Sequence, residues 1–374
     1  MTGTVAVMPI RYPAPLRPGD RIGVTSPSSG VADGLWPRFT YAVQSLRDKG
    51  FEVVVGEFNH TTHHRPAHIS GAREDRAAEL MGMLLDPSIR AVVPPWGGET
   101  AIDLLDLLDF DAIAAAEPTW CVGFSDSSTW LTPLTLTTGI ATIHGQNLMD
   151  TPYSVPDGIR HWRDVAATPA GGEIVQRSPG VHRTTGHDDY AAHPTVSDYA
   201  LDGRGSWVRI DPAHEGEPVT FSGRLVGGCV ETVSFIAGGR FADVETFADA
   251  HAPQGIVHLL DIAEWAATDI CRALHAMRLR GWFDRSSGIL VSRTRAPGLP
   301  DFSQHDVGAP APLPDLWSRR VLRLLGDEAR DRPLPRGRAP GDALDRARRG
   351  VALVLRRRSH RLTGPCRPVR SGAA

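Results

Sequence analysis

The segment Trp120–Ser128 reads W-C-V-G-F-S-D-S-S and decides how the first half of the chain folds. Its apolar start, residues 120–122, predicts a buried strand, and residues 127–137 predict a helix. A strand that runs through Gly-x-Ser into a helix is the setting of a nucleophile elbow, in which a tight turn lifts a hydroxyl toward backbone N–H groups. Ser125 is the candidate nucleophile. By itself, the pattern more often marks an ordinary serine at a helix start, and Ser127 replaces the usual second glycine.

The pattern around this segment predicts an α/β fold with a parallel, Rossmann-like sheet. Short apolar runs alternate with stretches of helical spacing. The predicted strands are residues 21–25, 51–55, 91–93 and 140–143, and the predicted helices are residues 36–46, 72–85 and 101–108.

The remaining chain divides into three parts by composition. We expect an N-terminal domain over 1–165, a linker over 166–222, a smaller α/β domain over 223–306, and an aberrant or disordered Arg/Pro-rich tail over 307–374. Residues 151–220 predict irregular structure and residues 223–239 a turn and a helix. The smaller domain has predicted strands at 256–260 and 288–292, and a predicted helix at 268–280.

Composition excludes several classes of protein. The 374 residues are 41% hydrophobic and 22% charged, with a net charge of −3, which argues against a disordered chain and a dedicated nucleic-acid binder. No apolar run is long enough to span a membrane. The four cysteines lie far apart without a C-x-x-C motif, which predicts a reduced, cytoplasmic protein. The histidines cluster at 60–68 and 182–193 without the spacing of zinc ligands. We therefore expect no metal or other cofactor.

Two further segments follow predicted strands. The first, P-P-W-G-G-E over residues 94–99, has paired glycines that permit close backbone approach and leave N–H groups available. Carboxyl ends of parallel strands share one edge, so this turn and Ser125 are expected together where ligands bind. The second, H-L-L-D-I-A-E over residues 258–264, ends in acids that could orient a histidine or could simply complement a helix dipole.

An ordered set of motifs resembles the serine peptidase family of the LD-carboxypeptidases and the microcin C immunity protein. The set covers residues 15–306, and the W-G-G-E and G-G-C variants are closer to the immunity branch. The motifs are R-P-G-D-R-I-G-V-T-S-P-S-S-G (17–30), S-G-A-R-E-D-R-A-A-E-L (70–80), W-G-G-E (96–99), G-F-S-D (123–126), G-R-L-V-G-G-C (223–229) and R-L-R-G-W-F-D (278–284).

The resemblance implies a Ser-Glu-His triad and a homodimer. The family serine falls on Ser125, and its oxyanion hole falls on the backbone amides of Asp126, Gly97 and Gly98. Its glutamate falls on Asp261, one methylene shorter, with Glu264 as a nearby substitute. Trp96 and Glu99 are expected to contact the substrate. None of the histidines after Glu264, which are His275, His305 and His360, carries the family motif.

The function implied is hydrolysis of an amide bond beside a free carboxylate, in a peptidyl or aminoacyl nucleotide or in a murein peptide. Because a triad without its histidine has no positioned base, we expect very low or no peptidase activity. The alternative is an inactive binding protein that sequesters such a ligand. A third possibility is nucleic-acid binding by the basic tail, which salt-sensitive, tail-dependent DNA binding would reveal.

The tail suggests a shifted reading frame from about residue 307. Residues 319–374 hold 16 Arg against 5 Asp or Glu, a net charge of +11 in a chain whose total is −3. A disordered basic tail on a diverged protein is the alternative. An unbroken frame in independently sequenced isolates would rule the shift out. On this hypothesis the final family strand is lost, and the sheet edge at Ile289 and Leu290 is expected to be open.

Overall fold

The architecture was determined from a computed structural model, which describes residues 8–60, 69–209, 219–294, 321–326 and 352–356. Several predictions therefore lie outside the described residues. These are the predictions for His63, His64, His68, His305, His360, Cys366 and most of the 307–374 tail.

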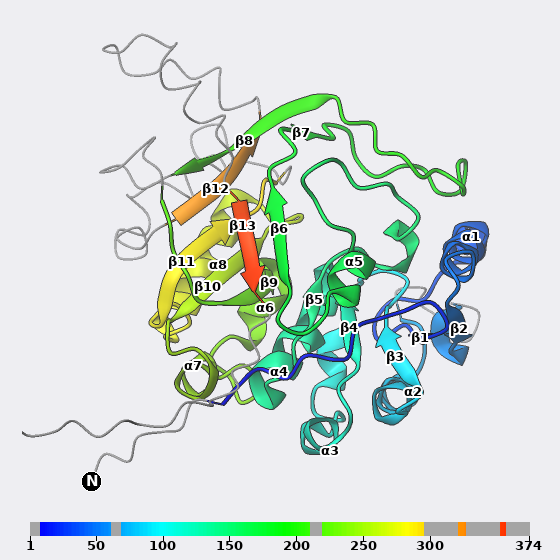
Figure 1. The fold of residues 1–374 in the computed structure, drawn as a ribbon, viewed down its shortest axis with the longest axis horizontal. Helices are drawn as coiled ribbons and strands as arrows, with labels where there is room; N and C mark the ends of the chain where they lie inside the picture. The colour runs from blue at the N-terminus through cyan, green and yellow to red at the C-terminus, as the bar shows by residue number, and fades with distance from the viewer. Residues whose placement is uncertain (1–7, 61–68, 210–218, 295–320, 327–351, 357–374) are drawn as a thin grey trace, which may run out of the picture.

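The N-terminal domain is built on a five-stranded parallel sheet with the order β2-β1-β3-β4-β5 (Figure 1). This confirms the predicted parallel α/β architecture. The strands are β1 (Arg21–Val24), β2 (Glu52–Val55), β3 (Ile89–Val92), β4 (Trp120–Gly123) and β5 (Ile143–His144). Alternate residues of these strands face opposite layers, as a strand period of two requires: Trp120 and Val122 face one layer and Cys121 the other.

Helices cover both faces of this sheet. In α1 and α2 the apolar positions recur at helical spacing, so one side of each is buried, whereas α4 is buried on nearly every side. The helices α1 (Trp36–Arg47) and α5 (Trp162–Ala167) contribute to the layer with Trp120 and Val122, and α2 (Arg73–Leu85), α3 (Phe110–Ala115) and α4 (Ser128–Thr138) to the layer with Cys121.

The C-terminal domain has a six-stranded sheet with the order β7-β8-β12-β11-β10-β9. Four of its strands are parallel: β9 (Arg224–Cys229), β10 (Ile256–Asp261), β11 (Ser286–Val291) and β12 (Val321–Gly326). Two antiparallel strands complete it, β7 (Val181–His182) and β8 (Gly203–Arg209). Its helices are α6 (Val230–Ile236), α7 (Val244–His251) and α8 (Ala267–Leu279). A separate ribbon pairs β6 (Glu173–Arg177) with β13 (Ala352–Arg356).

Some secondary-structure predictions were wrong. The segment 151–220 holds α5, β6, β7 and β8 rather than irregular structure alone, and residues 224–229 form β9 rather than a turn. Both β6 and β8 pair with strands far along the chain, so local pattern could not reveal them. The helix expected over 101–108 is a short 3-10 turn at Ala101–Leu104.

The expected open sheet edge is also absent. β12 pairs in parallel with β11, Ile289 with Val321 and Leu290 with Leu322, and both β11 residues are buried. A strand from the region expected to be aberrant therefore covers this edge.

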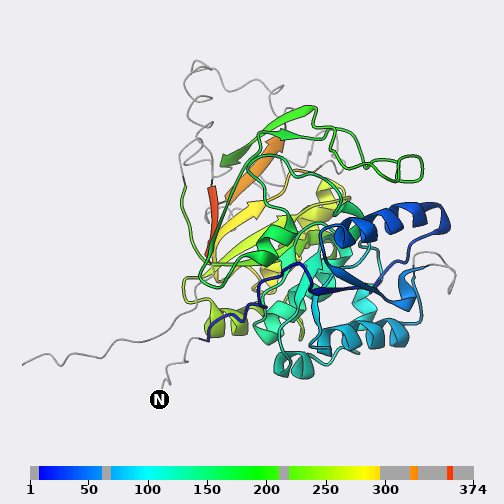
Figure 2. The same cartoon turned by 45° about the vertical axis from the view of Figure 1, so that its right-hand side comes forward.

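The two domains share one hydrophobic core through α4. Leu131 and Leu134 of α4 lie in the same buried cluster as Val226 of β9 and Val233 of α6. The two sheets lie side by side in both views (Figures 1 and 2). Two hydrogen bonds fix their alignment: Thr132 Oγ1 donates to Gly227 O at 2.8 Å, and Cys229 N donates to Ser128 Oγ at 3.1 Å. No helix among the described residues is long and apolar enough to cross a membrane.

Truncation of Leu134 tests this shared core. Leu134 is 1% exposed, so Leu134→Ala should lower the free energy of unfolding by about 2–5 kcal/mol, through lost burial and the cavity left behind. The matched control is Leu279→Ala, at a side chain that is 76% exposed, and it should change stability by less than about 0.5 kcal/mol. Chemical denaturation measures both, and equal effects would contradict the position of α4.

Candidate active site

Ser125 sits on a strained turn at the carboxyl end of β4. Its φ of +60° makes it the non-glycine residue with positive φ in the described part of the chain. Such a conformation costs about 1–3 kcal/mol and persists only where the surroundings enforce it. The turn is held from the neighbouring loop, because Phe124 N donates to Asn147 Oδ1 at 3.2 Å. Ser125 is half-buried, so its hydroxyl lies at an accessible edge of the sheet.

Gly97 lies directly against Ser125. A Cβ built on Gly97 would fall 2.8 Å from Ser125 Cβ, 2.9 Å from its Oγ and 3.0 Å from Asp126 N. The loop after β3 and the turn after β4 therefore meet at one sheet edge, as the sequence predicted. Only a residue without a side chain fits at position 97.

The buried carboxylate of Asp126 joins three loops at this edge. It accepts hydrogen bonds from Ser28 Oγ at 2.7 Å, from Ala101 N at 2.9 Å and from Thr129 Oγ1 at 2.8 Å. Ser28 Oγ in turn accepts from Thr100 N at 3.0 Å. The loops after β1 and β3 are thus fixed to the 3-10 turn Ser125–Ser127, which carries Ser125, and to the first turn of α4, which follows it.

The loop after β3 turns through Gly98, whose φ is +139°. The hydroxyls of Ser28 and Ser29 occupy the place where a side chain on Gly98 would be. Among the described residues, no hydrogen-bond acceptor is found for the backbone N–H groups of Gly97, Gly98 or Asp126. Unpaired N–H groups beside a serine hydroxyl are the donors that an oxyanion hole requires.

The two side chains predicted to contact substrate flank this loop. Trp96 is half-buried, and its indole Nε1 donates to Ser29 O at 3.1 Å, so it also ties the loop after β3 to the loop after β1. Glu99 is exposed.

An acid from the C-terminal domain and an imidazole from the N-terminal domain form a pair near this edge. Asp261 ends β10, and its Oδ2 lies 3.4 Å from Nε2 of His144, which ends β5. Burial by itself would raise the pKa of Asp261, but hydrogen bonds from His144, Ser292 and the Ile262 N–H outweigh it and hold this pKa below its ordinary value. Asp261 is therefore ionised at neutral pH. Glu264 is exposed.

Glu231, at the start of α6, fixes the loop that follows Asp261. Its Oε1 accepts from three successive backbone groups, Ala263 N and Glu264 N at 2.9 Å and Trp265 N at 3.1 Å. Its Oε2 accepts from Cys229 Sγ at 3.0 Å. Burial and the charges of Glu231 and Asp261 raise the pKa of the Cys229 thiol, so this cysteine stays protonated and is a poor nucleophile.

The sequence predicted Ser125, Asp126, the diglycine turn and Asp261 as site residues, and it did not indicate His144 or Glu231, which the structure places beside them. His144 lies in I-H-G, at the end of a strand that the sequence did indicate. Because the carboxyl ends of parallel strands share one edge of the sheet, the end of this strand could have been added to the predicted site, and His144 with it. Glu231 binds loop N–H groups more than thirty positions away, and nothing local signals such a contact.

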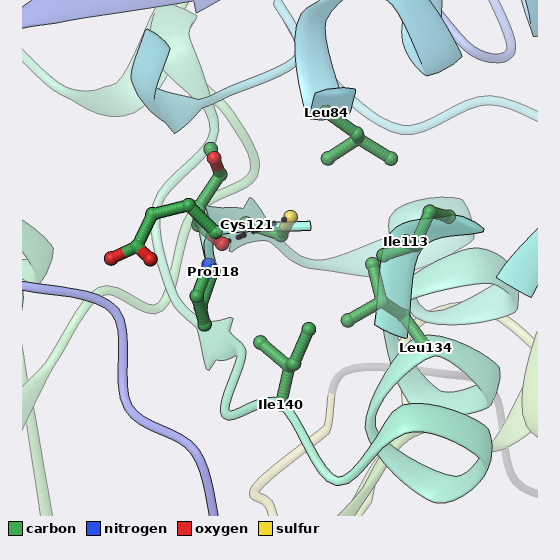
Figure 3. Close-up of a pocket in the computed structure, with 8 residues that line it drawn as sticks. Leu84, Ile113, Pro118, Cys121, Leu134 and Ile140 are labelled. Atoms are coloured by element: carbon green, nitrogen blue, oxygen red, sulfur yellow. Dashed lines mark hydrogen bonds between the residues drawn. The ribbon is translucent and has the colours of Figure 1, made fainter. Parts of the chain in front are cut away.

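The described residues also enclose a small apolar pocket away from this edge. It measures about 10 Å³ and is lined by residues including Cys121, Leu134 and Ile140 (Figure 3). Its lining residues Thr119 and Cys121 lie at the amino end of β4, whereas Ser125 follows the carboxyl end of that strand. This pocket is a packing gap rather than part of the site.

Comparison with known protein families agrees with this geometry. A model of the LD-carboxypeptidase N-terminal domain matches residues 22–145, and a model of the C-terminal domain matches residues 222–322. The chain belongs to the LD-carboxypeptidase family. Since the match extends to residue 322, the family pattern continues beyond residue 307, where we expected it to end.

The relatives of this chain include proteins named as carboxypeptidases and a microcin immunity protein, the two groups that the motifs resemble. A putative carboxypeptidase of Vibrio cholerae is 25% identical over 286 residues, 75% of this chain and 79% of the relative. The microcin C7 self-immunity protein MccF of Escherichia coli is 34% identical over 136 residues, 36% of this chain and 38% of MccF. These relatives support membership of a serine hydrolase family.

The fold is that of MccF. The structure of MccF in complex with glutamyl sulfamoyl guanosine has a TM-score of 0.66 and 20% identity, covering 84% of this chain and 92% of MccF.

Substitution of Gly97 tests the packing at Ser125. Gly97→Ala places a methyl group against the hydroxyl and the Asp126 N–H, so the reaction of Ser125 with a fluorophosphonate should slow by at least about 100-fold, as loss of an oxyanion donor does. Intact-mass spectrometry over time measures this rate. The matched control is Gly34→Ala, where an added Cβ meets nothing within 4 Å. Equal rates in both variants would show that Gly97 does not face the hydroxyl.

Proposed function

We propose that this protein is a serine hydrolase that cleaves an amide bond next to a free carboxylate. One observation carries the proposal: the strained Ser125 is held against Gly97, beside N–H groups that have no acceptor among the described residues. Strained backbone conformations of this kind cluster at active sites and ligand-binding turns. The buried Cys229 thiol is no competitor as the nucleophile.

The chemistry follows from these positions. Ser125 Oγ attacks the carbonyl carbon of the substrate and gives its proton to a base. The carbonyl oxygen becomes an oxyanion, which the N–H groups of Gly97, Gly98 and Asp126 stabilise. When the C–N bond breaks, the leaving nitrogen takes the proton and the acyl group stays on Ser125. Water then attacks the acyl-enzyme, releases a carboxylate and restores the hydroxyl.

The substrate class that we favour is a small aminoacyl or peptidyl nucleotide, with a murein peptide as the alternative. MccF, which shares this fold, has been solved with glutamyl sulfamoyl guanosine and with aspartyl sulfamoyl adenosine. Trp96 offers an aromatic ring beside the diglycine loop, where a base could stack. Glu99 is exposed at the same loop, where it could meet a substrate amine. Homodimer formation stays a prediction from the resemblance, and cytoplasmic location stays a prediction from the spacing of the cysteines.

Labelling tests the nucleophile. Wild-type protein should form a single fluorophosphonate adduct at Ser125 and hydrolyse an aminoacyl sulfamoyl adenosine faster than an L,D-tetrapeptide. Ser125→Ala should form no adduct and lose at least about 1,000-fold in hydrolysis, because the nucleophile is gone. Tandem mass spectrometry locates the adduct, and chromatography follows the hydrolysis.

The matched control is Ser88→Ala, at an exposed serine remote from the site, which should behave as wild type does. Calorimetric binding of the sulfamoyl adenosine without labelling or hydrolysis would instead support the sequestering protein. Labelling at another residue would overturn the assignment of Ser125.

A further inference from the structure

The proposed hydrolase needs an imidazole, and the sequence offers no family histidine after Asp261. The structure brings an imidazole to this acid from the other domain. His144 Nε2 lies 3.4 Å from Asp261 Oδ2, and each side chain is about one-quarter exposed, 26% for His144 and 25% for Asp261. The two side chains are therefore partly open to solvent and otherwise packed against the protein.

Strand register places His144 next to the nucleophile turn. His144 pairs with Gly123, and Ser125 follows Gly123 by two residues. Adjacent strands lie about 4.8 Å apart, so the imidazole begins one strand away from the turn that carries the hydroxyl. Ser125 Oγ makes no hydrogen bond among the described residues, so it is available to such a base. Catalytic hydrogen bonds in ligand-free sites often form only when substrate binds.

A pocket beside His144 is lined by hydroxyl groups on one helix and by apolar side chains. His144 lines a pocket of about 80 Å³ together with hydroxyls of α4, including those of Ser128 and Thr132, and with Gly227 of β9. Ser128, which follows Ser125 by three residues, lines this pocket together with the imidazole. This volume holds several waters, and one water can bridge a hydroxyl to its base.

Two other described histidines are engaged elsewhere. His161 Nε2 is hydrogen-bonded to Thr151 O at 3.0 Å, and burial lowers the pKa of this imidazole to about 4. His251 Nδ1 is bonded to Met8 O at 3.0 Å. In the described part of the chain, His144 is the imidazole that contacts Asp261.

We propose that His144, oriented by Asp261, is the general base for Ser125, in place of a histidine from the C-terminal segment. This inference rests on the proposed hydrolase function. With Nε2–H directed at the Asp261 carboxylate, Nδ1 carries the free lone pair. Nδ1 takes the Ser125 proton as Oγ bonds to the carbonyl carbon, and the imidazolium returns that proton to the leaving nitrogen as the C–N bond breaks. In the second half, Nδ1 takes a proton from water and returns it to Ser125.

Each half of this pair comes from a different domain, so their alignment depends on α4. Glu231 holds the loop after Asp261 through three N–H groups, and Thr132 and Ser128 hold β9 against α4. Asp261 and Glu231 are therefore positioning residues, and His144 is the residue that we assign to proton transfer. We expected very low activity because the chain lacks the family histidine and Ser125 would have no base. If His144 is that base, this reason no longer applies.

The test is the rate of fluorophosphonate labelling in the full-length chain, with and without added imidazole. His144→Ala should slow labelling of Ser125 by about 100-fold or more, as loss of a general base does. Free imidazole should restore part of the rate in His144→Ala, because it can occupy the vacated space, and should not change Ser125→Ala. Asp261→Asn should also slow labelling, and imidazole should not rescue it.

The matched control is His60→Ala. His60 forms a comparable pair, with Nε2 2.9 Å from Asp33 Oδ1, and its loss should leave the labelling rate unchanged. Wild-type rates in His144→Ala would overturn the proposal. A loss that imidazole fails to restore, in a variant that melts as the wild type does, would also overturn it and reduce His144 to a structural role. If wild-type protein itself does not label at Ser125, the hydrolase function has failed rather than the assignment of its base.

Discussion

The site depends on the buried carboxylate of Asp126. A buried carboxylate is stabilised only when its oxygens accept hydrogen bonds, and here the donors come from the loop after β1, the loop after β3 and the first turn of α4. Satisfying that one group brings the diglycine turn against Ser125. The same contacts hold the turn at Ser125, so the surrounding loops maintain the strained backbone conformation of that residue.

Helix α4 links this site to the second domain. Its first turn follows Ser125, its apolar side lies in the shared core, and its hydroxyls hold the end of β9. Asp261 on the next strand is thereby placed within reach of His144. A site assembled from two domains requires such a fixed interface, because a shift of about 1 Å can cost roughly 100-fold in rate.

The parallel sheet, the helices α1, α2 and α4 and the meeting of two loops at one edge could all be predicted from the sequence, whereas α3 was not. Period-two apolar runs and Gly-rich turns are local signals, and the shared edge follows from parallel topology. β6, β8 and β12 could not be predicted in the same way, because their partners lie far along the chain. The Gly-x-Ser turn and the paired glycines are the local signals behind the predictions for Ser125 and Gly97, and the structure places these two residues in contact. His144 was overlooked because the family motif directed attention to the C-terminal segment, whereas strand register supplies an imidazole from β5.

A crystal structure of the protein after reaction with a fluorophosphonate tests the central claim most directly. The account predicts a phosphorus–oxygen bond to Ser125 Oγ, with a phosphoryl oxygen about 2.7–3.1 Å from the backbone nitrogen of Asp126 and from one of the diglycine nitrogens. The Asp126 carboxylate should still accept from Ser28 and Ala101. An adduct on another residue, or a phosphoryl oxygen directed away from these nitrogens, would contradict it.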